Sequence, residues 1–65
     1  MDSVSYDVEF RTARYTGDTT EMSDWIFDNE YSSADAAEDA AEFLYTVYRH
    51  VRVVTRTNTT EYREL

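Results

Sequence analysis

Apolar and polar residues alternate at the start of the chain, where single polar residues separate Val4, Tyr6, Val8 and Phe10. A period of two is typical of a strand with one buried face. A weaker alternation continues to residue 14, and a polar cluster around the only glycine, Gly17, predicts a reversal of the chain. We expect a loop of about eight residues to follow this reversal.

A second strand is predicted over 25–31. Trp25, Phe27 and Tyr31 fall on one side of it, and Ile26, Asp28 and Glu30 fall on the other. Because only a reversal and a loop separate the two strands, we expect them to pair as an antiparallel hairpin.

The next segment has the spacing of a helix, predicted over 33–49. Ser32 and Ser33 are equally good candidates for the N-cap, with Asp35 in the first turn and Arg49 near the end, as the helix dipole favours. The apolar stripe of the helix contains Ala36, Ala37, Ala40, Ala41, Phe43, Leu44, Val47 and Tyr48. The small alanines would let the helix lie close to the sheet, with Phe43, Leu44 and Val47 filling its wider end.

A third strand is predicted over 51–56, and residues 57–59 form a plausible turn before a short final strand over 60–64. The order strand-strand-helix-strand, with a possible fourth strand, predicts an α+β fold. Its architecture is a small antiparallel sheet with one amphipathic helix packed on one face.

Length and composition limit the kind of protein. A chain of 65 residues with 42% hydrophobic residues and ten aromatic side chains is expected to fold as a single domain, 1–65. It has no cysteine, which excludes disulfide bonds and thiolate zinc sites. No apolar run approaches the length of a membrane span, and the first residues lack a targeting pattern, so we expect a soluble, cytoplasmic protein.

The charged residues are segregated along the chain. Between Tyr15 and Tyr48 there are nine acidic residues and no Lys or Arg, and all six arginines lie outside this segment. The net charge of -8 therefore comes from one segment, the acidic block: Asp18, Glu21, Asp24, Asp28, Glu30, Asp35, Glu38, Asp39 and Glu42. A localised field of this kind acts on charged partners and says little about the fold.

Four carboxylates of the predicted helix recur at i, i+3, i+4 and i+7 and share one face: Asp35, Glu38, Asp39 and Glu42. At a rise of about 1.5 Å per residue they form a ridge roughly 10 Å long. A helix face that serves stability pairs such acids with cations one turn away, but here Asp35 faces Asp39 and Glu38 faces Glu42. The ridge is either a solvated helix face or part of a binding surface.

If the second strand and the loop before it lie near the start of the helix, the acidic block forms one anionic surface. Such a surface repels nucleic acid and competes with it for grooves lined by Arg and Lys. The residues expected to contact a cationic nucleic-acid-binding protein are Asp24, Asp28, Glu30, Asp35, Glu38, Asp39, Glu42 and Tyr45.

The arginines of the flanks have a different expected role. Arg11, Arg52 and Arg56 are predicted to lie on the open face of the sheet as members of cross-strand pairs. Their candidate partners are Asp7, Glu9, Asp28 and Glu30. We expect no direct binding of DNA or RNA.

No motif for catalysis or cofactor binding occurs in the sequence. Asp18, Glu21 and Asp24 are spaced by three, which does not match the alternate ligands and central glycine of an EF-hand loop. The only histidine, His50, lies where the helix passes into a strand, a position that favours capping of carbonyls over base catalysis. There is no serine nucleophile elbow, phosphate-binding loop or HExxH motif. We expect no enzymatic activity, no metal and no cofactor.

One small core cannot bury all of the tyrosines at positions 15, 31, 45, 48 and 62. They either pack at the core edge with their hydroxyls in water or contribute to an interface with a partner or a second copy. The alternative function is therefore a homo-oligomeric interaction or assembly module whose acidity serves solubility or high-salt adaptation. The absence of lysine fits salt adaptation and also a GC-rich coding source.

In length, charge, lack of cysteine and element order, with an acidic helix over 33–49, the chain resembles the small DNA-mimic inhibitors of phages and mobile elements, including anti-CRISPR proteins. The resemblance includes no sequence motif, so it assigns no role to a single residue. It implies stoichiometric binding to the cationic surface of a host defence complex, such as a CRISPR–Cas complex, in the host cytoplasm.

Overall fold

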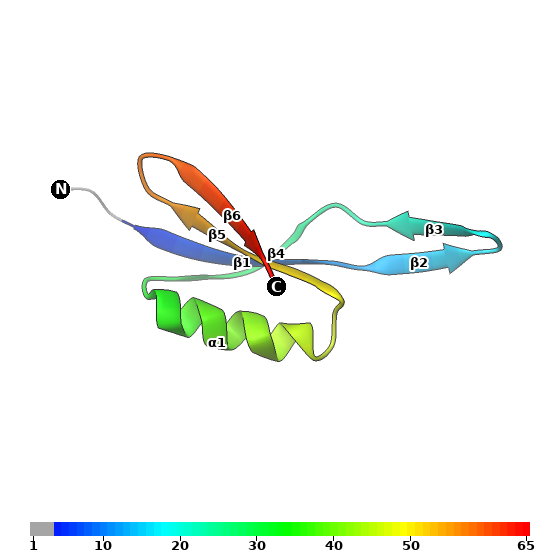
Figure 1. The fold of residues 1–65 in the computed structure, drawn as a ribbon, viewed down its shortest axis with the longest axis horizontal. Coiled ribbons are helices and arrows are strands. Elements are labelled where there is room, and N and C mark those ends of the chain that lie inside the picture. Colours follow the sequence, from blue (N-terminus) through cyan, green and yellow to red (C-terminus); the bar gives the residue numbers. More distant parts are fainter. Residues whose placement is uncertain (1–3) are drawn as a thin grey trace.

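The protein has an α+β fold, as the sequence predicts. The structure, a computed structural model, describes residues 4–65; residues 1–3, the start of the stretch that lacks a targeting pattern, lie outside the described part. The described chain forms a four-stranded antiparallel sheet, a two-stranded antiparallel sheet and one helix (Figure 1). In this part of the chain no helix is long and apolar enough to cross a lipid bilayer.

From one edge to the other, the four-stranded sheet contains β4 (Ile26–Tyr31), β1 (Ser5–Arg11), β5 (His50–Arg56) and β6 (Thr60–Glu64). Neighbouring strands are antiparallel throughout. All four strands of this sheet were expected from the hydrophobic pattern, including the short final one. The helix connects the edge strand β4 to β5 along the chain. In the sheet these two strands are not neighbours, because β1 lies between them.

The prediction of a loop of about eight residues after the reversal is wrong, because residues 13–22 form a hairpin. β2 (Ala13–Thr16) pairs with β3 (Thr19–Met22), and Gly17 closes the turn with a φ of 64°, a conformation that suits glycine. Arg14 lies opposite Glu21, which places unlike charges across the two strands. The hairpin projects beyond the sheet and gives the molecule a longest dimension of 51 Å (Figure 1).

A bulge in β4 changes which side chains share a face. The pairing advances by one residue in β1, from Val8 to Glu9, and by two in β4, so Asp28 is the extra residue of a β-bulge. Tyr31 therefore packs against the core beside the helix, whereas Phe27, opposite Glu9, lies on the other face. The prediction that both residues lie on one side of the strand is wrong for this reason.

The helix α1 (Ala34–Tyr45) begins where the sequence predicts and ends earlier. Ser33 is the N-cap, and its hydroxyl accepts from the Ala36 N–H at 3.3 Å. At the other end the Thr46 hydroxyl donates to the Phe43 carbonyl at 2.6 Å, and the chain turns away. The helix ends here because the Thr46 side chain bonds to the helix backbone and is followed by Val47, a second β-branched residue. Arg49 is therefore not part of the helix.

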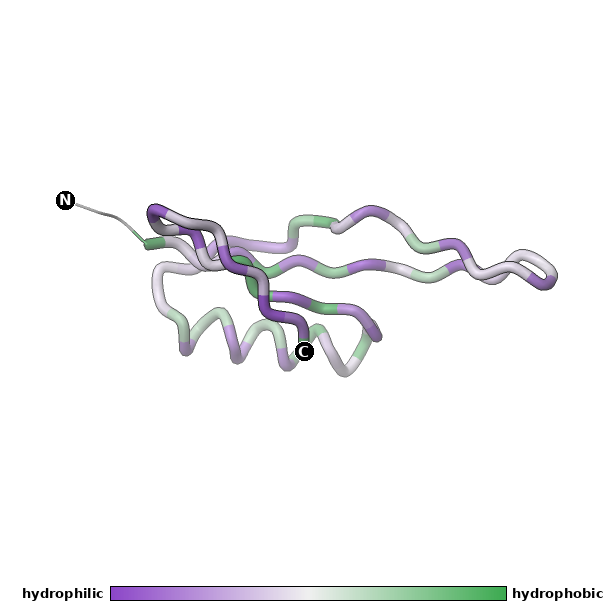
Figure 2. Tube along the Cα trace, turned by 45° about the horizontal axis from the view of Figure 1, so that its top comes forward, coloured by the Kyte–Doolittle hydropathy of each residue, from purple (hydrophilic) through white to green (hydrophobic). Residues whose placement is uncertain are grey.

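The core lies between α1 and one face of the sheet. Ala37 and Ala41 are fully buried against Val8, Val51 and Val53, which confirms that small residues bring the helix close to the sheet. Figure 2 shows apolar residues alternating with polar ones along the helix.

The predicted apolar stripe is too broad at its end. Leu44 packs on the core, but Phe43 is 71% exposed and Val47 is 66% exposed. Phe43 lies about 100° around the helix from Leu44, and Val47 follows the last helical turn, so neither faces the sheet. These two apolar side chains are part of the molecular surface.

Candidate functional site

The outer face of α1 carries three exposed carboxylates, on Asp35, Asp39 and Glu42. They lie at i, i+4 and i+7, on the side of the helix opposite the buried Ala37 and Ala41. Among residues 4–65 none of the three forms an ion pair. We call this set the helical acidic face.

Glu38, the fourth predicted member of the ridge, does not belong to this face. It is half-buried at the flank of the helix, where it forms an ion pair with Arg63 of β6. Glu38 follows the buried Ala37 by one residue, which turns its side chain toward the sheet margin. Its charge is therefore neutralised within the chain, and no sequence pattern indicates an ion-pair partner 25 residues away.

The acids of β4 and the loop before it are not continuous with the helical acidic face. Glu30 lies opposite Asp7, and both point to the sheet face that α1 does not cover, which we call the open face. Asp28 is exposed at the bulge, and Asp24 is exposed just before the strand. The expectation of a single anionic surface is not met, because the sheet separates Glu30 from the helical acids.

The remaining acids of the acidic block lie on the hairpin, Asp18 in its turn and Glu21 in β3. Among residues 4–65 no three His, Asp or Glu side chains lie close enough together to hold a metal ion. Because they lie on the hairpin, these two acids add negative charge to a part of the surface separate from both β4 and the helical acidic face.

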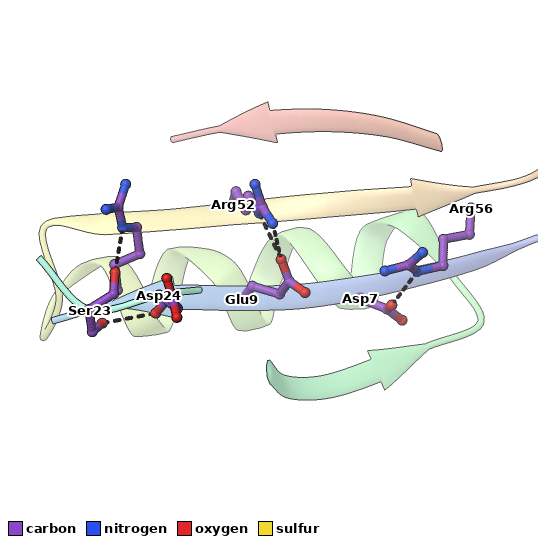
Figure 3. A network of polar contacts seen from close by, with 7 residues as sticks. Asp7, Glu9, Ser23, Asp24, Arg52 and Arg56 are labelled. Atoms are coloured by element: carbon purple, nitrogen blue, oxygen red, sulfur yellow. Dashed lines mark hydrogen bonds and ion pairs between the residues drawn. The ribbon is translucent and has the colours of Figure 1, made fainter. Parts of the chain in front are cut away.

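Two predicted cross-strand ion pairs are confirmed on the open face (Figure 3). Arg52 contacts the Glu9 carboxylate at 2.7 Å, and Arg56 contacts the Asp7 carboxylate at 2.7 Å. Arg11 forms no ion pair among residues 4–65; its Nε donates to the Ser23 carbonyl at 2.9 Å. Within this part of the chain, Arg52 and Arg56 thus neutralise acids of β1 and leave the helical acidic face without counter-charges.

Arg52 also lies between two aromatic rings. Its guanidinium carbon is 4.2 Å from the centroid of Trp25 and 4.5 Å from that of Tyr62. Arg11 approaches the same indole ring at 5.3 Å. These contacts were not predicted, because Trp25 reaches the open face only through the bulge in β4, which the sequence pattern does not show.

Asp7 is the only polar residue of the described chain that is buried. Its Oδ2 accepts from Arg56, while its Oδ1 has no hydrogen-bond partner within the described chain. The hydrogen bond that Arg56 donates to the Asp7 carboxylate raises the pKa of the Arg56 guanidinium above its ordinary value. The guanidinium therefore remains charged throughout the ordinary pH range, which suits a structural ion pair.

The exposed tyrosines form no single patch. Tyr31 and Tyr48 pack at the core edge, the latter stacked on Phe10 with ring centroids 4.3 Å apart. Tyr45, the last residue of α1 and a predicted contact residue, is half exposed, and Tyr62 is 59% exposed on β6. Packing at the core edge is therefore confirmed for Tyr31 and Tyr48, and an interface role for Tyr45 and Tyr62 stays a prediction.

A groove of about 370 Å³ lies between the base of the hairpin and the segment that joins α1 to β5. Tyr15 and Val47 line it together with Arg11, Arg49 and His50, and no carboxylate is among its lining residues. The groove is therefore cationic and partly apolar, opposite in sign to the helical acidic face. His50 is the first residue of β5, at the place predicted for it.

Searches of protein-family models, curated proteins and solved structures found no match to this chain. The function must therefore be argued from the surfaces described above.

Proposed function

We propose that this chain is a non-enzymatic binding protein that presents the helical acidic face to a cationic partner. The observation that supports the proposal is the separation of paired from unpaired acids. Arg52, Arg56 and Arg63 pair with Glu9, Asp7 and Glu38, while Asp35, Asp39 and Glu42 have no counter-charge among residues 4–65. Local helix stability does not require such an arrangement, because Asp35 and Asp39 repel each other one turn apart.

The helical acidic face presents a row of negative charges, as a nucleic-acid backbone does. Its three carboxylates lie about 5 Å apart along roughly 10 Å of helix, whereas one DNA strand carries a phosphate about every 3.4 Å. A surface lined by Arg and Lys that binds phosphates would therefore attract this face. The protein would act by occupying that surface and excluding nucleic acid.

A host defence complex of the CRISPR–Cas kind is the narrower form of this proposal. Its support is the similarity in size, charge and element order to phage-encoded DNA mimics. Asp24, Asp28 and Glu30 add negative charge at and just before the edge strand β4, and only a partner large enough to reach around this edge of the sheet would contact them as well as the helix. Tyr45 would add an aromatic contact at the end of the helical acidic face.

The test compares capture of partners by the wild-type protein and by the double variant Asp39→Lys/Glu42→Lys. Both positions are exposed and unpaired, so the substitutions preserve the fold, whereas a change at Glu38 would also break its pair with Arg63. The matched control is Asp18→Lys/Glu21→Lys, which changes the net charge equally but on the hairpin.

The wild type and the control should capture the same nucleic-acid-binding protein at about 0.1 M salt and release it at about 0.5 M. The helix variant should capture none. Capture by the helix variant at wild-type yield would contradict the proposal.

A second candidate function, a homo-oligomeric assembly module, is favoured by a different observation. The acidic block is divided among the hairpin, β4 and α1, as expected where acidity serves solubility or salt tolerance, and Tyr15, Tyr45 and Tyr62 are exposed. Association of this kind would be weakened little by salt and more by removal of Tyr45 and Tyr62 than by removal of carboxylates.

A further inference from the structure

The strand β6 has a free edge. It is the last strand of the four-stranded sheet, and within residues 4–65 only β5 pairs with it. Such an edge presents unpaired backbone groups to any strand that can align with it. The helix packs mainly on β1, β5 and β4, and its contact with β6 is the ion pair of Glu38 with the Arg63 side chain, which leaves the outer backbone edge of β6 uncovered within residues 4–65.

The hydrogen bonds of the ladder identify which groups of β6 are free. The Leu65 N–H donates to the Val51 carbonyl at 3.0 Å, and the Thr57 N–H donates to the Thr59 carbonyl at 3.1 Å. In an antiparallel ladder, bonded and non-bonded pairs alternate. The odd-numbered residues of β6 therefore bond to β5, and the N–H and C=O groups of Thr60, Tyr62 and Glu64 point outward.

We propose that β6 pairs with β6 of a second copy of this chain, antiparallel and with the two-fold axis at Tyr62. In this register Tyr62 lies opposite Tyr62 of the other copy, and Thr60 lies opposite Glu64. All of these residues have outward-pointing backbone groups, so each pair can exchange two hydrogen bonds. The two sheets would then join into one continuous sheet of eight strands.

The side chains select this register. It places Glu61 directly opposite Arg63 of the other copy, twice by symmetry, at positions where the backbones do not bond and side chains approach most closely. A two-fold axis at Glu61 would oppose two glutamates, and an axis at Arg63 would oppose two arginines. Axes at either end of β6 would leave most of the strand unpaired.

The other free edge is less suitable for pairing between copies. β4 is interrupted by its bulge, and its charged residues, Asp28 and Glu30, are both acidic. Pairing two copies of β4 would bring like charges together and would have to accommodate two bulges. β6, by contrast, carries charged side chains of both signs, and their order brings opposite charges together when two copies of β6 pair antiparallel.

The test is sedimentation equilibrium of the wild type and of Glu61→Arg, from about 10 µM to about 1 mM protein. Glu61 is exposed and forms no ion pair within the described chain, so its reversal should preserve the monomer fold. Because each reversal converts two attractive contacts into repulsive ones, the dimer dissociation constant should rise at least about tenfold. A wild type that is monomeric throughout, or a dimer unaffected by Glu61→Arg, would overturn the proposal.

A charge-exchanged variant provides the rescue. Glu38→Arg/Glu61→Arg/Arg63→Glu inverts every charge involved, so it retains both the pair within the chain and the pair between copies. It should dimerise about as strongly as the wild type. A rescue variant that remains as weak as Glu61→Arg would show that the pairing is not in this register.

Amide exchange measured by NMR gives an internal control. The Tyr62 amide points to solvent in a single chain, so its exchange should slow as protein concentration rises. The Arg63 amide already bonds to β5 and should change little. Equal responses of the two amides would contradict edge pairing.

This inference does not depend on the binding function proposed for the helical acidic face; it gives the second candidate function, homo-oligomeric assembly, a specific interface. Glu61→Arg leaves the helical acidic face intact, and Asp39→Lys/Glu42→Lys leaves β6 intact. The two proposals therefore fail separately, one by loss of dimerisation and the other by loss of partner capture.

Discussion

Arg52 joins three side chains of the open face, and replacing it with alanine should destabilise the fold. Its guanidinium pairs with Glu9 and lies against Trp25 and Tyr62. A charge-assisted hydrogen-bonded pair contributes about 1.5–3 kcal/mol, and each cation–π contact about 0.5–1 kcal/mol. Because the contacts share one guanidinium and do not add fully, we expect Arg52→Ala to lower the free energy of unfolding by about 3 kcal/mol.

Part of this loss comes from the carboxylate that remains. The Glu9 side chain is only 13% exposed, so removing Arg52 leaves a largely buried charge without a cation. Glu9→Gln should therefore destabilise the wild type but stabilise the Arg52→Ala variant by roughly 1 kcal/mol. This reversal of sign separates loss of the ion pair from loss of packing.

The assay is urea unfolding followed by the fluorescence of Trp25, the only tryptophan, with far-UV circular dichroism as a second probe. Arg52→Lys keeps the charge but loses the planar stacking, so it should fall between the wild type and Arg52→Ala. The reasoning is refuted if Arg52→Ala costs less than about 1 kcal/mol, or if Glu9→Gln has the same effect in both backgrounds.

Three further predictions test the fold. Ser33→Ala should lower the free energy of unfolding, measured with urea, by about 1 kcal/mol because it removes the N-cap, whereas Ser32→Ala should lower it little; equal effects would show that Ser33 is not the N-cap. Leu44→Ala should cost about 2 kcal/mol and Phe43→Ala less than about 0.5 kcal/mol, and the reverse order would contradict the orientation of α1. Gly17→Ala should speed amide exchange in β2 and β3 alone, since alanine is strained at a φ of 64° and, within residues 4–65, these strands pair only with each other; faster exchange in β1 would contradict this.

The elements with regular periodicity could be predicted from the sequence. β1 alternates apolar and polar residues over seven positions, β5 does so from His50 to Val53, and the start of α1 has a serine cap followed by buried alanines. The elements that were missed lack such signals. β3 reads Thr-Thr-Glu-Met, which has no alternation, and it is ordered by pairing with β2 across the turn at Gly17.

For the candidate site, the sequence predicts which charged residues are present and two of the ion pairs of the sheet, but it does not predict which acids share a surface. The ion pairs of Arg52 and Arg56 with acids of β1 follow from positions on the same face of neighbouring strands: Arg52 lies directly opposite Glu9, and Arg56 lies diagonally across from Asp7. The pairing of Glu38 with Arg63 depends on where β6 lies relative to the flank of α1, which helical periodicity alone does not determine. The bulge at Asp28 moves Trp25 to the open face, and a single extra residue leaves no mark in the hydrophobic pattern.

The most direct test of the central claim is competition for the captured partner. Labelled duplex DNA bound to that partner would be titrated with the wild type, with Asp39→Lys/Glu42→Lys and with the hairpin control Asp18→Lys/Glu21→Lys. We predict that the wild type and the control displace the DNA stoichiometrically and that the helix variant requires at least about ten times more protein. Failure of the wild type to displace DNA, or equal displacement by the helix variant, would contradict the claim that the helical acidic face binds the partner's nucleic-acid-binding surface.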